Sequence, residues 1–77
     1  MEQKIKQDEI HIGQNIREIR LTHGIGQTEL VRKLQLEGIE ITRETLVKIE
    51  RGIQHIQAAQ LRGIKEVLGT TYDELFK

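Results

Sequence analysis

The fold of this chain is decided by residues 27–51, which read QTELVRKLQLEGIEITRETLVKIER. The apolar residues of this stretch recur at the spacing of three and four that places side chains on one face of a helix. They are Leu30, Val31 and Leu34 in the first half and Leu46 and Ile49 in the second. Gly38 and the apolar–polar alternation of residues 39–41 interrupt the spacing. The stretch therefore predicts helices over residues 27–36 and 42–51, joined by a short extended linker.

The sequence on either side of this stretch predicts three more helices. Isoleucines recur at positions 12, 16 and 19, which predicts a first helix over residues 12–23. After residue 57 the same spacing returns, and it predicts a fourth helix that ends at Gly69. Thr71 and Glu74 have the spacing of a capping box and open a short fifth helix. We therefore expect an all-α fold of five helices.

Glycine and threonine mark the expected helix ends. Gly24 suits the left-handed conformation that closes the first helix, and Gly26 is a weak N-cap for the second. Thr42 caps the third helix, which ends at Gly52. Gly63 lies in the middle of the fourth helix, where it costs about 1 kcal/mol relative to alanine, so close helix packing is expected there.

Composition limits the class of protein. The chain has 77 residues, which suits one small hydrophobic core, and no cysteine for a disulfide or a thiolate metal site. Charged residues interrupt every apolar run, so we expect no membrane span and a cytoplasmic protein. We divide the chain into an N-terminal extension over residues 1–11, frayed or helical, and one helical domain over residues 12–77.

No pattern in the chain indicates an enzyme. His11, His23 and His55 do not have the spacing of metal ligands. No nucleophile has a recognisable base partner, and the glycines at positions 24 and 26 join two helices rather than form a phosphate-binding loop. We expect a protein without catalytic activity, without a cofactor and without a metal.

A series of short motifs follows the expected helices in order. They are IREIR at residues 16–20, GIGQ at 24–27, KL at 33–34, IERG at 49–52 and LGTTYDELF at 68–76. Together they resemble the phage-repressor-like helix-turn-helix family, often called the XRE or lambda-repressor-like family. The resemblance covers residues 12–76 and implies a sequence-specific, repressor-like transcriptional regulator. In this fold the helix at residues 27–36 crosses the backbone of double-stranded DNA, and the helix at residues 42–51 lies in the major groove.

The resemblance implies which side chains read the bases. Arg43 matches the principal base-reading position, where an arginine pairs with guanine O6 and N7; the alternative is a solubilising surface arginine. Glu44 either accepts a hydrogen bond from cytosine N4 or pairs with Lys48 four residues later. Lys48 matches a position that reaches bases or phosphate. Thr42 and Thr45 contact a thymine methyl group or a phosphate, with helix capping as the primary role of Thr42.

Other positions are implied to contact the DNA backbone or to support the fold. Gln27 matches the glutamine that holds a phosphate at the N-terminus of the second helix, and Thr28 is its neighbour in that role. Arg51 and Arg17 extend the phosphate contacts, although exposed arginines elsewhere look the same. The remaining matched positions form a partly buried structural ion pair between the first and third helices. They are Arg20 and Glu50.

The chain departs from the family pattern at three places. Gly26 replaces the usual hydroxyl-bearing cap of the second helix. Residues 35–41 form a longer connection than the usual turn of about 3–4 residues, so the third helix is expected to be tilted or displaced. The loop after Gly52 offers Gln54 and His55 where basic residues often hold phosphate.

Two readings of the partners stay open. The first is a homodimer on a palindromic operator, formed through the fifth helix, with Tyr72 and Phe76, or through residues 1–7. The second is a protein-interaction module, such as an antitoxin or a regulatory adaptor, that keeps the fold and binds another protein. Zero net charge and the apolar residues of the long connection favour the second reading. Exposure of Leu36, Ile39 and Ile41 would support it, and their burial would remove the argument.

Overall fold

The structure, a computed structural model, describes residues 4–5 and 11–77. The described residues form five helices and two short strands. The helices are α1 (Ile12–Thr22), α2 (Gln27–Leu36), α3 (Arg43–Glu50), α4 (Ala58–Leu68) and α5 (Tyr72–Phe76), and the strands are β1 (Lys4–Ile5) and β2 (Ile56–Gln57). The predicted all-α fold of five helices is confirmed. No helix in this part of the chain has the length and apolar content needed to cross a bilayer.

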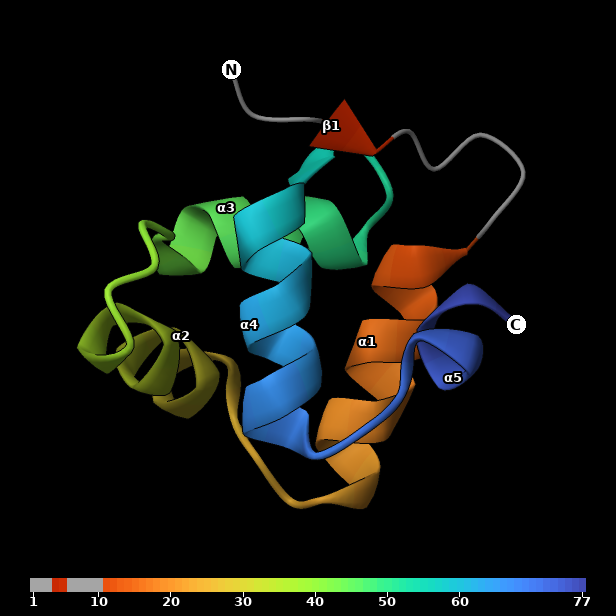
Figure 1. Cartoon of the computed structure of the whole chain (residues 1–77), viewed down its shortest axis with the longest axis horizontal. Helices are drawn as coiled ribbons and strands as arrows, with labels where there is room; N and C mark the ends of the chain where they lie inside the picture. Colours follow the sequence, from red (N-terminus) through yellow and green to blue (C-terminus); the bar gives the residue numbers. More distant parts are fainter. Residues whose placement is uncertain (1–3, 6–10) are drawn as a thin grey trace.

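Helix α4 occupies the centre of the fold. It lies between α1 on one side and α2 on the other, with α5 beside α1 (Figure 1). Helix α3 packs against both α1 and α2. The apolar faces predicted from the sequence meet in the middle, and their fully buried members are Ile12, Ile16, Leu30, Leu34, Leu46, Ile49, Ile56, Ile64, Leu68 and Leu75. Truncating such a side chain to alanine costs about 2–5 kcal/mol, so the core holds α3 in one orientation.

The helix ends follow the predicted caps. Thr42 Oγ1 accepts a hydrogen bond of 3.1 Å from the Thr45 backbone N–H. Thr71 Oγ1 accepts one of 3.2 Å from the Glu74 N–H at the start of α5. Gly26 is the N-cap of α2 and offers no side-chain bond, as expected for a glycine. A threonine side chain thus fixes the start of α3.

The connection between α2 and α3 is packed rather than loose. A Cβ atom at Gly63 of α4 would collide with Ile39 Cδ1 and lie 3.1 Å from Leu34 Cδ2, which confirms the predicted close packing at this glycine. The backbone carbonyl of Ile41 accepts a hydrogen bond of 2.9 Å from Gln35 Nε2. On the α4 side, Gln60 Nε2 donates a bond of 3.1 Å to the Glu40 carbonyl. The longer connection is therefore held by side-chain hydrogen bonds from α2 and α4 and by the packing of Ile39, and it leads into α3 in a fixed conformation.

The two short strands differ from the expectations for the N-terminal extension and for the loop after Gly52. Residues 1–11 were expected to be frayed or helical, and residues 53–57 to form a loop. Instead, β1 and β2 pair antiparallel, with Lys4 opposite Gln57 and Ile5 opposite Ile56. The helical alternative is therefore wrong for residues 4–5, while residues 1–3 and 6–10 lie outside the described part. A pairing between segments so far apart leaves no local pattern in either segment.

Candidate nucleic-acid interface

One face of α3 is buried and the opposite face is exposed. Leu46 and Ile49 are fully buried in the core. The other side carries the polar side chains that the sequence assigned to base reading. Thr45 is half-buried and the others are exposed; the set is Thr42, Arg43, Glu44, Thr45 and Lys48. The structure thus brings these five residues together at the first two turns of one helix.

Arg43 is the first residue of α3 and is exposed. Its guanidinium makes no hydrogen bond or ion pair with any other residue that the structure describes. An arginine in this state has all of its N–H donors available for the planar, two-pronged contact that guanine accepts. The position suits base reading, and it suits a solubilising role equally in the absence of DNA.

Glu44 and Lys48 form the surface pair that the sequence left as an alternative. Lys48 Nζ lies 3.5 Å from Glu44 Oε1, and the two side chains are 47% and 80% exposed respectively. An exposed pair of this kind contributes at most about 0.5 kcal/mol to helix stability. Both side chains can therefore separate at little cost when a ligand approaches the helix.

The hydroxyl groups of Thr42 and Thr45 are joined to each other. Thr42 Oγ1 donates to Thr45 Oγ1 at 3.0 Å and accepts from the Thr45 backbone N–H. The capping role of Thr42 is therefore present in the structure. Thr42 is nevertheless exposed, so a ligand is able to contact it while its hydroxyl group keeps the cap.

Arg20 and Glu50 form a bidentate ion pair that joins α1 to the end of α3. Arg20 Nε lies 2.8 Å from Glu50 Oε2, and Arg20 Nη2 donates to Glu50 Oε1 at 2.9 Å. Arg20 Nη1 also donates to the Ile25 carbonyl at 2.9 Å. The two side chains are 7% and 2% exposed. One buried arginine therefore ties three segments together: α1, the loop after it, and α3.

Gln27 is connected to this ion pair, which sequence reasoning missed. Gln27 Nε2 donates a hydrogen bond of 3.1 Å to Glu50 Oε1. The amide at the start of α2 is thus held by the carboxylate at the end of α3, with its carbonyl oxygen and second N–H still available. No local signal identifies this contact, because the two residues lie on different helices. Thr28, the next residue of α2, is exposed.

Arg17 and Arg51, expected along the DNA backbone, line the same hollow. It lies between the start of α1 and the end of α3, and His11 and Gln14 also line it. Glu50 and Gly52 complete the wall on the α3 side. From the sequence, His11 was considered only as a possible metal ligand, and Gln14 was not singled out. Only the packing of α1 against α3 brings these side chains together.

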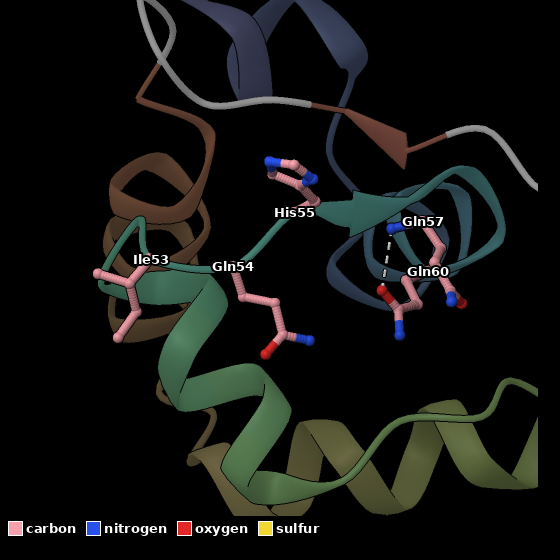
Figure 2. Close-up of a pocket in the computed structure, with 5 residues that line it drawn as sticks. All are labelled: Ile53, Gln54, His55, Gln57 and Gln60. Atoms are coloured by element: carbon pink, nitrogen blue, oxygen red, sulfur yellow. Dashed lines mark hydrogen bonds between the residues drawn. The ribbon is translucent and has the colours of Figure 1, made fainter.

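A second hollow lies beside the loop between α3 and α4 (Figure 2). Side chains from the loop and from the start of α4 line it, and Gln54 extends from the loop toward the side of Gln60 (Figure 2). The Gln57 backbone N–H donates to Gln60 Oε1 at 3.0 Å, which holds that amide in place. The lining residues are Ile53, Gln54, His55, Gln57 and Gln60. This loop therefore offers amides and one imidazole where the family pattern often has basic residues.

A metal centre has no support among the described residues. His11, His23 and His55 are all exposed, and no three histidine, cysteine, aspartate or glutamate side chains within residues 4–5 and 11–77 gather closely enough to hold an ion.

Two solved structures share this fold. The clp gene regulator ClgR from Corynebacterium glutamicum superposes with a TM-score of 0.74 at 20% sequence identity, covering 84% of this chain and 64% of ClgR. The restriction-modification controller protein C.AhdI from Aeromonas hydrophila superposes with a TM-score of 0.70 at 27% identity, covering 87% of this chain and 94% of C.AhdI. This chain therefore spans less than two thirds of the ClgR structure. No protein-family model and no curated protein matches the sequence. The helix-turn-helix fold implied by the sequence motifs is confirmed by these similarities.

Proposed function

We propose that this protein is a sequence-specific DNA-binding transcriptional regulator that reads the major groove with α3. The observation that carries the proposal is the contrast between the buried face and the exposed face of that helix. Its inner face is fixed by the core and by the Arg20–Glu50 pair, while its outer face presents polar and charged side chains that are exposed except for the half-buried Thr45. A groove reader needs this combination, because base contacts demand a rigid helix with adaptable side chains. The descriptions of ClgR and C.AhdI as a gene regulator and a controller protein support the proposal.

Each group on the interface has a role in this proposal. Arg43 pairs with guanine O6 and N7, and Glu44 accepts from cytosine N4 once Lys48 turns to the DNA. Thr42 and Thr45 contact a thymine methyl group or a phosphate. Phosphate contacts flank the reading helix and fix its register. They come from Gln27 and Thr28 at the start of α2 and from Arg17 and Arg51 beside the end of α3.

A homodimer is part of the proposal because one module binds DNA weakly. The chain has no net charge, so the electrostatic contribution from a single copy is small. Tyr72 and Phe76 stack at a centroid distance of 6.0 Å and are 39% and 38% exposed. This aromatic pair on α5 is the surface that we assign to the dimer. Two copies would present their α3 helices to half-sites about 34 Å apart.

Selection of duplexes from a random DNA pool tests the proposal. We expect a palindromic consensus, and an affinity that falls steeply as salt rises. The variant Arg43→Ala should lose the preferred base at one position of each half-site. Arg62→Ala is the matched control, because Arg62 is an exposed arginine of α4 outside the proposed interface. Failure of the wild-type protein to enrich any sequence at low salt would contradict the proposal.

A protein partner is a second candidate function, and one side chain favours it. Leu36 at the end of α2 is 81% exposed. The other two residues that the sequence argument used are packed, since Ile41 is 5% exposed and Ile39 lies against Gly63. Of the three apolar residues, only Leu36 therefore still supports an antitoxin or adaptor, together with the zero net charge of the chain. A co-purified protein that is released by Leu36→Ser, with DNA binding intact, would support this candidate.

The proposal describes a non-enzymatic, cytoplasmic protein without cofactor or metal. It keeps residues 12–77 as the DNA-binding domain and residues 1–11 as its extension. Removal of residues 1–11 tests this division, because the remaining chain should fold and bind the same duplex.

A further inference from the structure

The hollow between α1 and the end of α3 has a positive lining. Arg17 projects from α1, and Arg51 follows the last residue of α3. Both side chains are exposed, and neither guanidinium makes a hydrogen bond or ion pair with another residue in the part of the chain that the structure describes. The two cations therefore line the same space, and no carboxylate of residues 4–5 or 11–77 pairs with either of them.

Among the described residues, Glu50 is the one carboxylate in the wall of this hollow, and it is already paired. Glu50 is 2% exposed at its side chain, and both of its oxygens accept hydrogen bonds from Arg20. Gln27 adds a third bond to Oε1. Because Arg20 neutralises Glu50, the charged side chains left in the described lining of the hollow are Arg17 and Arg51.

We propose that this hollow binds one phosphate group, held jointly by Arg17 and Arg51. Guanidinium groups match the oxygens of phosphate in a two-pronged geometry, which makes arginine the preferred residue for such a site. His11 and Gln14 line the same space and supply further N–H donors. The phosphate belongs either to the DNA backbone, in which case the inference rests on the proposed function, or to a free phosphate-bearing molecule.

The place of the hollow fits a DNA phosphate beside the reading helix. Gly52 lines it, and the next residue, Ile53, lines the amide-rich hollow of Figure 2. Two polar hollows therefore adjoin at the end of α3. The DNA strand that α3 contacts would leave the major groove past the end of α3. One of its phosphates would then lie between Arg17 and Arg51.

The salt dependence of DNA binding tests the shared contact. Each neutralised phosphate adds about 0.9 to the slope of log K against log salt. The double variant Arg17→Gln/Arg51→Gln should lower the slope by about 0.9, and each single variant by less. Arg62→Gln, which removes one exposed charge from α4, should leave the slope unchanged. An unchanged slope in the double variant, or a loss of about 1.8 that indicates two separate phosphates, would overturn the proposal.

Inorganic phosphate without DNA identifies the source of the ligand. Amide chemical shifts of the wild-type protein are followed as phosphate replaces chloride at constant ionic strength. Shifts at His11 and Gln14 that Arg17→Gln abolishes would show a site that also takes free phosphate. The absence of such shifts, together with the slope loss, would show a site for the DNA backbone only. If the protein binds no DNA, the proposed function fails, and these shifts alone then decide for or against the hollow.

Discussion

The inner and outer faces of α3 each carry an ion pair, and the two pairs differ in kind. On the inner face, Arg20 and Glu50 lie 2.8 Å apart and are nearly completely buried. On the outer face, Lys48 and Glu44 lie 3.5 Å apart and are largely exposed. Removing one partner of a buried pair leaves a charge without solvent or counterion, whereas water replaces a lost partner at the surface. The same helix thus has a buried face that is fixed in the core and an exposed face whose side chains are able to rearrange.

The largest effect is expected from the inner pair. Glu50→Ala leaves the Arg20 guanidinium buried without its carboxylate, which should lower the free energy of unfolding by about 3–5 kcal/mol. Urea denaturation followed by circular dichroism measures the loss. The double variant Arg20→Met/Glu50→Leu should recover most of the stability, because it leaves no buried charge. A Glu50→Ala protein as stable as wild type would show that the pair does not hold the helix.

The packing that positions α3 gives the next prediction. Gly63→Ala places a methyl group against Ile39 and Leu34, and overpacking of this kind costs about 1–3 kcal/mol. Alanine also gains up to about 1 kcal/mol of helix propensity over glycine, so the net loss should fall near the lower end. Thermal unfolding measures it. Adding Ile39→Ala should relieve the collision. A Gly63→Ala protein more stable than wild type would mean that Ile39 and the connection between α2 and α3 move aside without cost.

The outer face should respond in binding rather than in stability. Arg43→Ala removes an exposed guanidinium that forms no hydrogen bond or ion pair with another described residue, so the unfolding temperature should change little. Discrimination against a substituted base at the contacted position should fall by about 1–3 kcal/mol, as measured by competition between duplexes. A large stability loss in this variant, with unaltered base preference, would assign Arg43 to the scaffold.

The smallest effect is expected from the exposed pair. Glu44→Gln breaks the contact with Lys48 and should change the free energy of unfolding by no more than about 0.5 kcal/mol, with less effect at high salt. Comparison of urea denaturation in low and high salt measures the contribution of the Glu44–Lys48 pair to the free energy of unfolding. A loss as large as that of Glu50→Ala would remove the distinction between the two faces.

Much of the scaffold follows from local sequence, and parts of the interface do not. The isoleucine spacing of α1 and the threonine at the start of α3 predict those elements, because helix periodicity and capping act within four residues. The bond from Gln27 to Glu50 has no such signature. It depends on the angle at which α2 crosses α3, and that angle is set by packing across the whole core.

The long connection before α3 illustrates the same limit. Its length is evident from the sequence and predicted a tilted or displaced helix, while the burial or exposure of its apolar residues stayed open. In the structure Ile39 fills the space above Gly63, Ile41 is buried, and only Leu36 of the three stays exposed. Whether an apolar side chain of a loop is buried depends on what the rest of the fold places beside it. Periodicity carries no information on that point outside a helix or strand.

The sequence by itself determined the helices, their caps and the residues that point outward from α3, since each rests on contacts between near neighbours along the chain. Tertiary structure alone decided the pairing of β1 with β2, the connection of Gln27 to the buried ion pair, and the meeting of Arg17 with Arg51 in one hollow. These features join segments that are distant in sequence. Their geometry arises only when the shared core fixes the helices relative to one another, because no local preference of either segment specifies its partner.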